Sequence, residues 1–193
     1  IGDLTGDGLP ELVLTANQGG PRLFLNAGKF RFRDITKPSG LKAGIESWTT
    51  GVTLADVNGD GRLDIYVCRA GPVKPERRAN ALWIHQGTNA DGVPTFREMA
   101  AEYGVADQGY STHAAFLDYD RDGDLDLFVL NNSPKPASSF GTRNLRHVRD
   151  PNGGAKLYRN DGNRFADVSG AAGIHSPEIA FGLGLAVGDV NRD

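Results

Sequence analysis

The stretch Asp118-Tyr119-Asp120-Arg121-Asp122-Gly123-Asp124-Leu125-Asp126 has acidic side chains at its odd positions and a glycine at position 6. The same spacing of oxygen-bearing side chains and glycine occurs in two earlier stretches and begins again at the end of the chain. These stretches are Asp3-Leu4-Thr5-Gly6-Asp7-Gly8-Leu9-Pro10-Glu11, Asp56-Val57-Asn58-Gly59-Asp60-Gly61-Arg62-Leu63-Asp64 and Asp189-Val190-Asn191-Arg192-Asp193. A pattern that recurs within one chain indicates repeated structural units.

Two further motifs follow each complete acidic stretch in a fixed order. The first reads leucine-aromatic-x-Asn/His-x-Gly and occupies residues 23–28, 82–87 and 157–162. The second runs from a phenylalanine to a Gly-aliphatic pair and occupies residues 32–41, 96–105 and 165–174. The alternative, unrelated acidic loops on an ordinary fold, does not account for three motifs in one order three times over.

Each repeat reads as a set of short strands. Residues 48–55 and 112–117 precede an acidic loop, residues 63–67 and 125–130 follow one, and both sets favour strands. The two further motifs supply a third and a fourth strand. We therefore predict an all-β fold, a partial β-propeller of about three four-stranded antiparallel blades. The predicted units are residues 1–44, 45–107 and 108–175, with a fourth starting at 176–193.

Composition excludes several classes of protein. The chain has 193 residues, 26 glycines and a net charge of −3, which argues against binding of nucleic acid by the domain as a whole. No apolar run is long enough to cross a bilayer. The single cysteine, Cys68, excludes an internal disulfide and a zinc site built from cysteines.

The acidic loops have the donor chemistry of a calcium site. Oxygen ligands at positions 1, 3 and 5 converge on one cation only if the backbone curls sharply, which the glycine at position 6 permits. A backbone carbonyl at position 7 and a carboxylate at position 9 would complete the shell of a hard cation such as Ca²⁺. The predicted metal ligands are Asp3, Thr5, Asp7, Leu9 and Glu11; Asp56, Asn58, Asp60, Arg62 and Asp64; Asp118, Asp120, Asp122, Asp124 and Asp126; and Asp189, Asn191 and Asp193.

Other calcium motifs do not fit the spacing. An EF-hand needs a glutamate at position 12, where this chain has Leu14, Val67 and Val129. The 118–126 loop offers the most carboxylates and is expected to bind tightest, while a solvated turn without metal is the simpler alternative for each loop.

These residues, together with the Phe181-Gly182 pair before Asp189, resemble FG-GAP/VCBS repeats, the blades of integrin-α-type β-propellers. The two added motifs resemble the cartilage-acidic-protein/UnbV branch of that family. The resemblance implies a calcium-stabilised propeller, with the metal roles on the loop residues named above, in a secreted, periplasmic or cell-surface protein. Thr5 and Glu11 depart from the usual residues of the pattern. The chain starts inside one unit and stops inside a loop, so we expect it to be a piece of a longer protein whose remaining blades are a partner.

The loops that join strands 2 and 3 emerge opposite the metal loops and are basic. Residues proposed there for binding an acidic protein or glycan are Arg77, Arg78, Arg143, Arg146 and Arg149. Solvated loops of ordinary charge are the simpler interpretation, and it is the favoured one.

The sequence favours a non-catalytic recognition or adhesion module, with a purely architectural spacer as a weaker option. The alternative is the propeller part of a polysaccharide-active, lyase-like enzyme whose active site lies in other regions. His113 is a candidate general base, with a structural histidine as the favoured interpretation. His85 is predicted to be a turn residue and Cys68 a buried filler.

Overall fold

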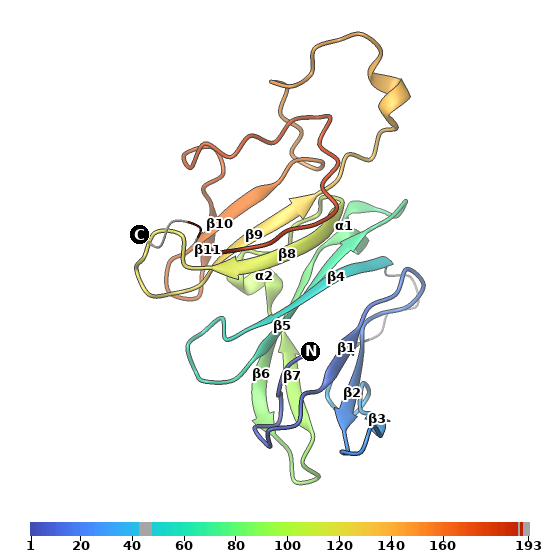
Figure 1. Ribbon diagram of the computed structural model, residues 1–193, viewed down its shortest axis with the longest axis vertical. Helices are drawn as coiled ribbons and strands as arrows, with labels where there is room; N and C mark the ends of the chain where they lie inside the picture. The colour runs from blue at the N-terminus through green and yellow to red at the C-terminus, as the bar shows by residue number, and fades with distance from the viewer. Residues whose placement is uncertain (43–47, 189, 191–193) are drawn as a thin grey trace.

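The computed structural model describes residues 1–42, 48–188 and 190 of the chain, and it contains three separate antiparallel sheets (Figure 1). The first sheet has the order β1-β2-β3, the second β4-β5-β6-β7 and the third β11-β10-β9-β8. The strands are β1 (Leu12–Leu14), β2 (Arg22–Asn26), β3 (Phe32–Asp34), β4 (Trp48–Ala55), β5 (Asp64–Ala70), β6 (Ala81–Thr88), β7 (Pro94–Glu98), β8 (Ser111–Leu117), β9 (Asp126–Asn131), β10 (Lys156–Asn160) and β11 (Phe165–Asp167). Neighbours in sequence pair with each other, so each sheet is a meander.

The all-β class is confirmed, and three antiparallel sheets are consistent with part of a β-propeller. The helical segments are single turns, α1 (Pro75–Arg78), α2 (Ala100–Tyr103) and the 3₁₀ turn η1 (Ala137–Phe140). Each sheet lies inside one predicted repeat unit, although the boundary between residues 44 and 45 falls outside the described residues. The unit boundaries and the number of blades in a closed propeller stay predictions.

Strand register places the acidic loops at one end of the sheets. Ala55 pairs with Asp64 and Leu117 with Asp126 on either side of two of the loops. Gly2 forms an isolated bridge to Glu11 at the equivalent point of the first loop. The connections from β5 to β6 and from β9 to β10 leave from the opposite end, where Trp48 pairs with Ala70.

Two hydrophobic cores lie between successive sheets. The first core, between the first and second sheets, is Leu4, Val13, Leu23, Ile35, Leu41, Ile65, Val67, Ala81, Trp83, Val93 and Phe96. The second core, between the second and third sheets, is Val57, Tyr66, Cys68, Leu82, Ile84, Ala100, Tyr103, Val105, Ala114, Leu127, Val129, Tyr158 and Phe165. Alternate residues of β5 enter different cores, because successive side chains of a strand point to opposite faces. This two-sided burial explains the continuous apolar run of β5.

A buried polar network also joins the second sheet to the third. The Asn80 side-chain amide donates to the Tyr66 hydroxyl at 3.0 Å and to the Ser111 hydroxyl at 2.9 Å. Ser111 in turn donates to Asn131 Oδ1 at 2.7 Å, and the Asn131 amide donates to the Gly154 carbonyl at 3.0 Å. Because all four side chains are buried, each hydrogen bond replaces one that water would supply in the unfolded chain.

The inner strands of the second and third sheets approach each other closely. A side chain at Gly51 in β4 would lie 2.6 Å from the Thr112 carbonyl oxygen and 2.9 Å from His113 Cα in β8. Beyond the third sheet, the segment after residue 180 runs beside β8 (Figure 1), where Thr112 Oγ1 donates to the Gly182 carbonyl at 2.9 Å. The described residues of this predicted fourth unit form two isolated bridges, Phe181 with Asn132 and Pro177 with Arg149, and no strand.

Candidate metal centres

The three complete acidic loops share one pattern of internal hydrogen bonds. The backbone N–H of the position-6 glycine donates to the position-1 carboxylate at 2.8 Å from Gly8, 2.8 Å from Gly61 and 3.1 Å from Gly123. These glycines have φ of 83°, 83° and 96°, the left-handed region in which a side chain is strained. The position-7 N–H donates to the position-5 carboxylate in each loop, from Leu9 to Asp7, from Arg62 to Asp60 and from Asp124 to Asp122.

The position-9 carboxylate of each loop is fully buried. One oxygen of Glu11, Asp64 and Asp126 accepts the N–H of position 2, at 2.7 Å, 2.9 Å and 2.9 Å. The other oxygen accepts a backbone N–H from the strand that carries the leucine-aromatic motif, which is β2, β6 or β10. These bonds come from Asn26 at 3.3 Å, from His85 at 2.8 Å and from Asn160 at 2.9 Å.

Burial makes the ionised form of these carboxylates costly. Desolvation raises the pKa of Asp64 to about 6, and it raises the pKa of Glu11 and of Asp126 in the same direction. The backbone N–H groups and the neighbouring aspartates act in opposite directions and are smaller effects. A bound cation would stabilise the ionised form of such a buried carboxylate.

The third loop brings three carboxylates together. One oxygen each from Asp118, Asp120 and Asp126 lies within 4.8 Å of the others, the one such acidic, histidine or cysteine cluster among the described residues. Asp124 Oδ1 is buried and has no hydrogen-bond partner among the residues that the structure describes. Its pKa is raised by desolvation and by Asp122 and Asp126. A cluster of carboxylate oxygens from Asp118, Asp120 and Asp126 fits a hard cation such as Ca²⁺.

The second and first loops differ from the third in their neutralising groups. Asp60 is paired with the Arg62 guanidinium at 2.7 Å and with the Asn58 amide at 3.1 Å. In the first loop, Asp3 accepts the N–H groups of Gly8, Gly6 and Thr5, and these bonds, with that from Gly8 the largest effect, lower the pKa of Asp3. The predicted ligands Asp189, Asn191 and Asp193 lie outside the described residues.

The hydrogen bond between the position-9 carboxylate and the strand of the leucine-aromatic motif was not predicted from the sequence. Asn26 and Asn160 each use their side-chain oxygen to accept an N–H in the following turn, from Gly28 and from Asn163. His85 does the same with Nδ1, which accepts the Gly87 N–H at 2.8 Å, while Nε2 contacts the Leu4 carbonyl at 3.0 Å. The recurrence of Asn or His at this place in the second motif was the available signal.

His85 is therefore not a turn residue as predicted, because it lies buried in β6 and contacts the first loop. Cys68 is fully buried in the second core, as predicted, and burial raises the pKa of its thiol. His113 lies in β8 opposite Gly51. Its Nδ1 is buried without a hydrogen-bond partner among the described residues.

Of the basic residues predicted to bind a ligand, Arg78 has an internal role instead. Its guanidinium donates to the Val73 carbonyl at 2.5 Å and the Gln108 carbonyl at 3.2 Å, and it lies 4.2 Å from the centre of the Tyr110 ring. The side chain is buried, so it stabilises the β5–β6 connection and is not available to a partner. Arg77 is exposed at the end of α1.

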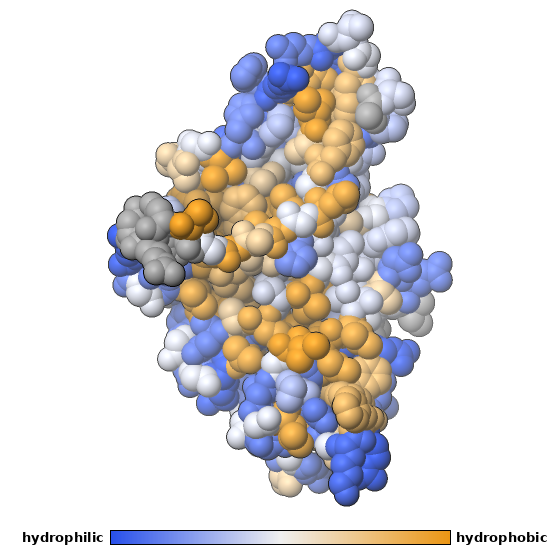
Figure 2. Space-filling model, in the orientation of Figure 1, coloured by the Kyte–Doolittle hydropathy of each residue, from blue (hydrophilic) through white to orange (hydrophobic). Residues whose placement is uncertain are grey.

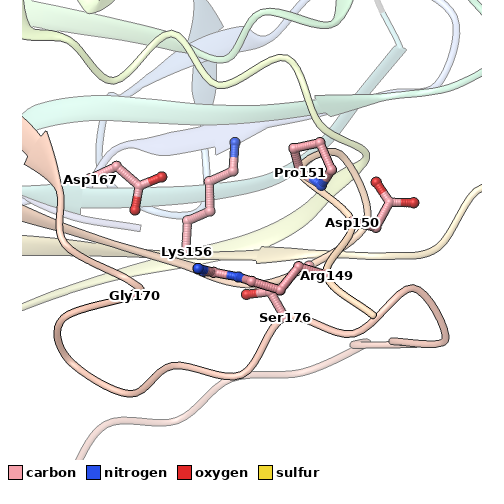
Figure 3. A pocket seen from close by; sticks show the side chains of 8 residues that line it. Arg149, Asp150, Pro151, Lys156, Asp167, Gly170 and Ser176 are labelled. Atoms are coloured by element: carbon pink, nitrogen blue, oxygen red, sulfur yellow. The ribbon is translucent and has the colours of Figure 1, made fainter. Parts of the chain in front are cut away.

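Arg149 lines a pocket of about 440 Å³ with Asp150, Lys156 and Asp167 (Figure 3). Lys156 Nζ is 2.6 Å from the buried carboxylate of Asp107, which also accepts the Tyr158 hydroxyl at 2.6 Å. Charges of both signs therefore line this pocket. The remaining two predicted residues, Arg143 and Arg146, are exposed and line a different cavity on the same connection.

Among the described residues, no helix has the length and apolar character needed to cross a bilayer. Comparison with known proteins supports the repeat pattern. Residues 3–67 match the family model of the FG-GAP-like repeat. The chain is 32% identical over 121 residues to cartilage acidic protein 1 of Xenopus tropicalis, an alignment that covers 62% of this chain and 17% of that protein. The family-model match and this relative support the assignment of the acidic loops and their strands to FG-GAP repeats.

Proposed function

We propose that this chain is a calcium-stabilised, non-catalytic segment of a β-propeller that serves recognition or adhesion outside the cytoplasm. The observation that carries the calcium part is the convergence of one carboxylate oxygen each from Asp118, Asp120 and Asp126, which lie within 4.8 Å of one another. The relative's name, which refers to cartilage, supports a location outside the cell.

Calcium would act on the fold and not on a reaction. When bound, the ion supplies positive charge to carboxylates that are buried or crowded together, and it thereby stabilises the turn that joins the first two strands of a sheet. Asp118, Asp120 and Asp126 would hold it in the third loop. Asp3, Asp7 and Glu11 would do so in the first loop, and Asp56, Asp60 and Asp64 in the second. A cation that binds only the folded chain raises the free energy of unfolding by mass action.

Thermal unfolding in chelator and in calcium tests this proposal. In about 10 mM calcium, each site with a Kd of about 10⁻⁴ to 10⁻³ M is expected to raise the free energy of unfolding by about 1.4 to 2.7 kcal/mol. For a chain of this size each such site raises Tm by about 3 to 10 °C. Mg²⁺ at the same concentration is expected to raise it less, because Mg²⁺ demands a stricter octahedral shell.

The matched variants are Asp118→Asn/Asp120→Asn in the third loop and Asp91→Asn/Asp161→Asn in two hairpin turns. Both remove two negative charges, but only the first is expected to reduce the increment in Tm that calcium produces. A Tm that is the same in chelator and in calcium would refute the calcium role.

A further inference from the structure

The connection between β9 and β10, residues 132–155, projects from the end of the third sheet that lies away from the acidic loops (Figure 1). The equivalent connections in the first and second sheets span only residues 15–21 and 71–80. Long connections in compact domains are commonly functional. Figure 2 shows apolar and strongly hydrophilic side chains next to one another on this projection.

The projection forms a groove with an apolar floor. Phe140 and Leu145 are each 6% exposed, and Ile179 and Phe181 complete the apolar lining of a cavity of about 570 Å³. The rings of Phe140 and Phe181 meet edge to face with centroids 6.2 Å apart. Phe181 is 48% exposed, so one face of the floor is open to a partner.

Backbone hydrogen bonds hold the two walls of the groove together. The Ser133 N–H donates to the Ala180 carbonyl at 2.7 Å, and the Glu178 N–H donates to the Val148 carbonyl at 2.7 Å. The bridge between Asn132 and Phe181 fixes the segment that supplies the open aromatic ring. A groove held in this way is largely formed before a partner arrives, which lowers the entropic cost of binding.

The rim of the groove is positively charged. Arg143 and Arg146 are exposed and line it, and none of its lining residues is acidic. The nearby carboxylate of Glu178 is already paired with Lys135. This contrasts with the chain as a whole, whose net charge is −3. Arginine pairs of this kind favour carboxylate groups, which they bind through two parallel hydrogen bonds.

We propose that this groove, residues 140–146 with 179–181, binds an acidic peptide segment of a partner protein through one apolar anchor side chain flanked by carboxylates. Leucine and isoleucine in the floor favour an apolar side chain over a sugar ring. An aromatic or aliphatic anchor in a pocket with charges at its rim is the usual construction of a protein-binding hot spot. The inference deepens the recognition part of the proposed function and is independent of the calcium part.

Fluorescence anisotropy with the 193-residue chain and labelled heptapeptides tests it. Each peptide has three Asp or Glu residues on either side of a central Phe, Leu or Ala. The Phe and Leu peptides are expected to bind, and the Ala peptide at least tenfold more weakly. Arg143→Gln/Arg146→Gln is expected to lower the affinity of the chain for the Phe peptide at least tenfold. The control, Arg31→Gln/Arg33→Gln on exposed residues just before and within β3, should change the affinity for the Phe peptide less than twofold.

Phe181→Ala is a second variant and should remove the preference for Phe over Ala; the exposed arginine pair tests the groove without altering its floor. Absence of binding, equal binding of the Phe and Ala peptides, an equal effect of both arginine pairs, or tighter binding of a heparin oligosaccharide than of the Phe peptide would each overturn the proposal. Melts in calcium and chelator on the same samples separate the two proposals, because a calcium-dependent Tm without peptide binding rejects the groove alone.

Discussion

At the scale of single residues, the position-9 carboxylate joins two motifs that are separated in sequence. Asp126 accepts the Tyr119 N–H from its own loop and the Asn160 N–H from β10, and Asp64 and Glu11 are placed in the same way. These bonds are made by the carboxylate itself, so they stabilise the sheet in addition to any bound cation. The residue therefore has a structural effect that can be measured in chelator.

Asp126→Asn is expected to lower the free energy of unfolding in chelator by about 1 to 3 kcal/mol. The amide keeps one acceptor but turns its NH₂ group toward a backbone N–H, which leaves a buried donor unsatisfied. Denaturant unfolding measures the change. The control is Asp161→Asn, which removes an exposed ion pair with Arg159 and should lower the free energy of unfolding by about 1 kcal/mol or less. Equal losses for the two variants would show that the buried bonds are not significant.

His85→Asn tests whether the histidine reproduces the role of Asn26 and Asn160. Asparagine can accept the Gly87 N–H but is too short to keep the contact with the Leu4 carbonyl. We expect a loss of about 1 kcal/mol, against about 1 to 3 kcal/mol for His85→Ala, which leaves both groups without a partner. The two variants are compared by denaturant unfolding, and an asparagine variant as unstable as the alanine variant would contradict the assignment.

At the scale of elements, contact between sheets requires a glycine in β4. Gly51→Ala is expected to destabilise the chain by about 1 to 3 kcal/mol, because its Cβ would overlap the Thr112 carbonyl and the backbone of His113. Gly184→Ala is the matched control. It has the same place relative to Asp189 that Gly51 has relative to Asp56, and its Cβ would have no neighbour within 4 Å among the described residues. Equal Tm values for the two variants would contradict the close packing of β4 on β8.

Much of the element structure could be predicted from the sequence. The motif order predicted the strands on both sides of the second and third acidic loops, and β4 begins and ends at the predicted residues Trp48 and Ala55. The alternation of apolar and polar residues and the turn residues are local signals, so they can be read without knowledge of the fold. The buried role of Arg78 and the contact from His85 to Leu4 depend on segments far apart in sequence, and no local pattern encodes them.

Part of the candidate site was predicted from the sequence, because the cluster of carboxylate oxygens holds three of the five residues predicted as ligands in the third loop. Spacing alone placed Asp118, Asp120 and Asp126 in one loop, and the structure brings their oxygens together. The spacing did not predict that backbone N–H groups would donate to the same carboxylates. Almost every residue carries a backbone N–H, so no residue type in the sequence marks the ones that do. Asn160 could be noticed as a recurring residue, but its N–H bond to Asp126 could not.

At the scale of the whole molecule, the two cores share a sheet and are expected to unfold together. Ile65 and Val67 of β5 lie in the first core, whereas Tyr66 lies in the second. Leu23→Ala and Leu127→Ala, one in each core and both fully buried, should each cost about 2 to 5 kcal/mol. Tryptophan fluorescence and far-UV circular dichroism should give coincident transitions for both variants. Two separated transitions in either variant would contradict a shared core.

Calorimetric titration with calcium measures binding at the acidic loops without relying on stability. If the loops bind calcium, the unaltered chain gives saturable heat with a Kd of about 10⁻⁴ to 10⁻³ M, and Asp118→Asn/Asp120→Asn loses the tightest phase. Titrations without saturable heat, or identical for the chain and this variant, would contradict calcium binding by the loops.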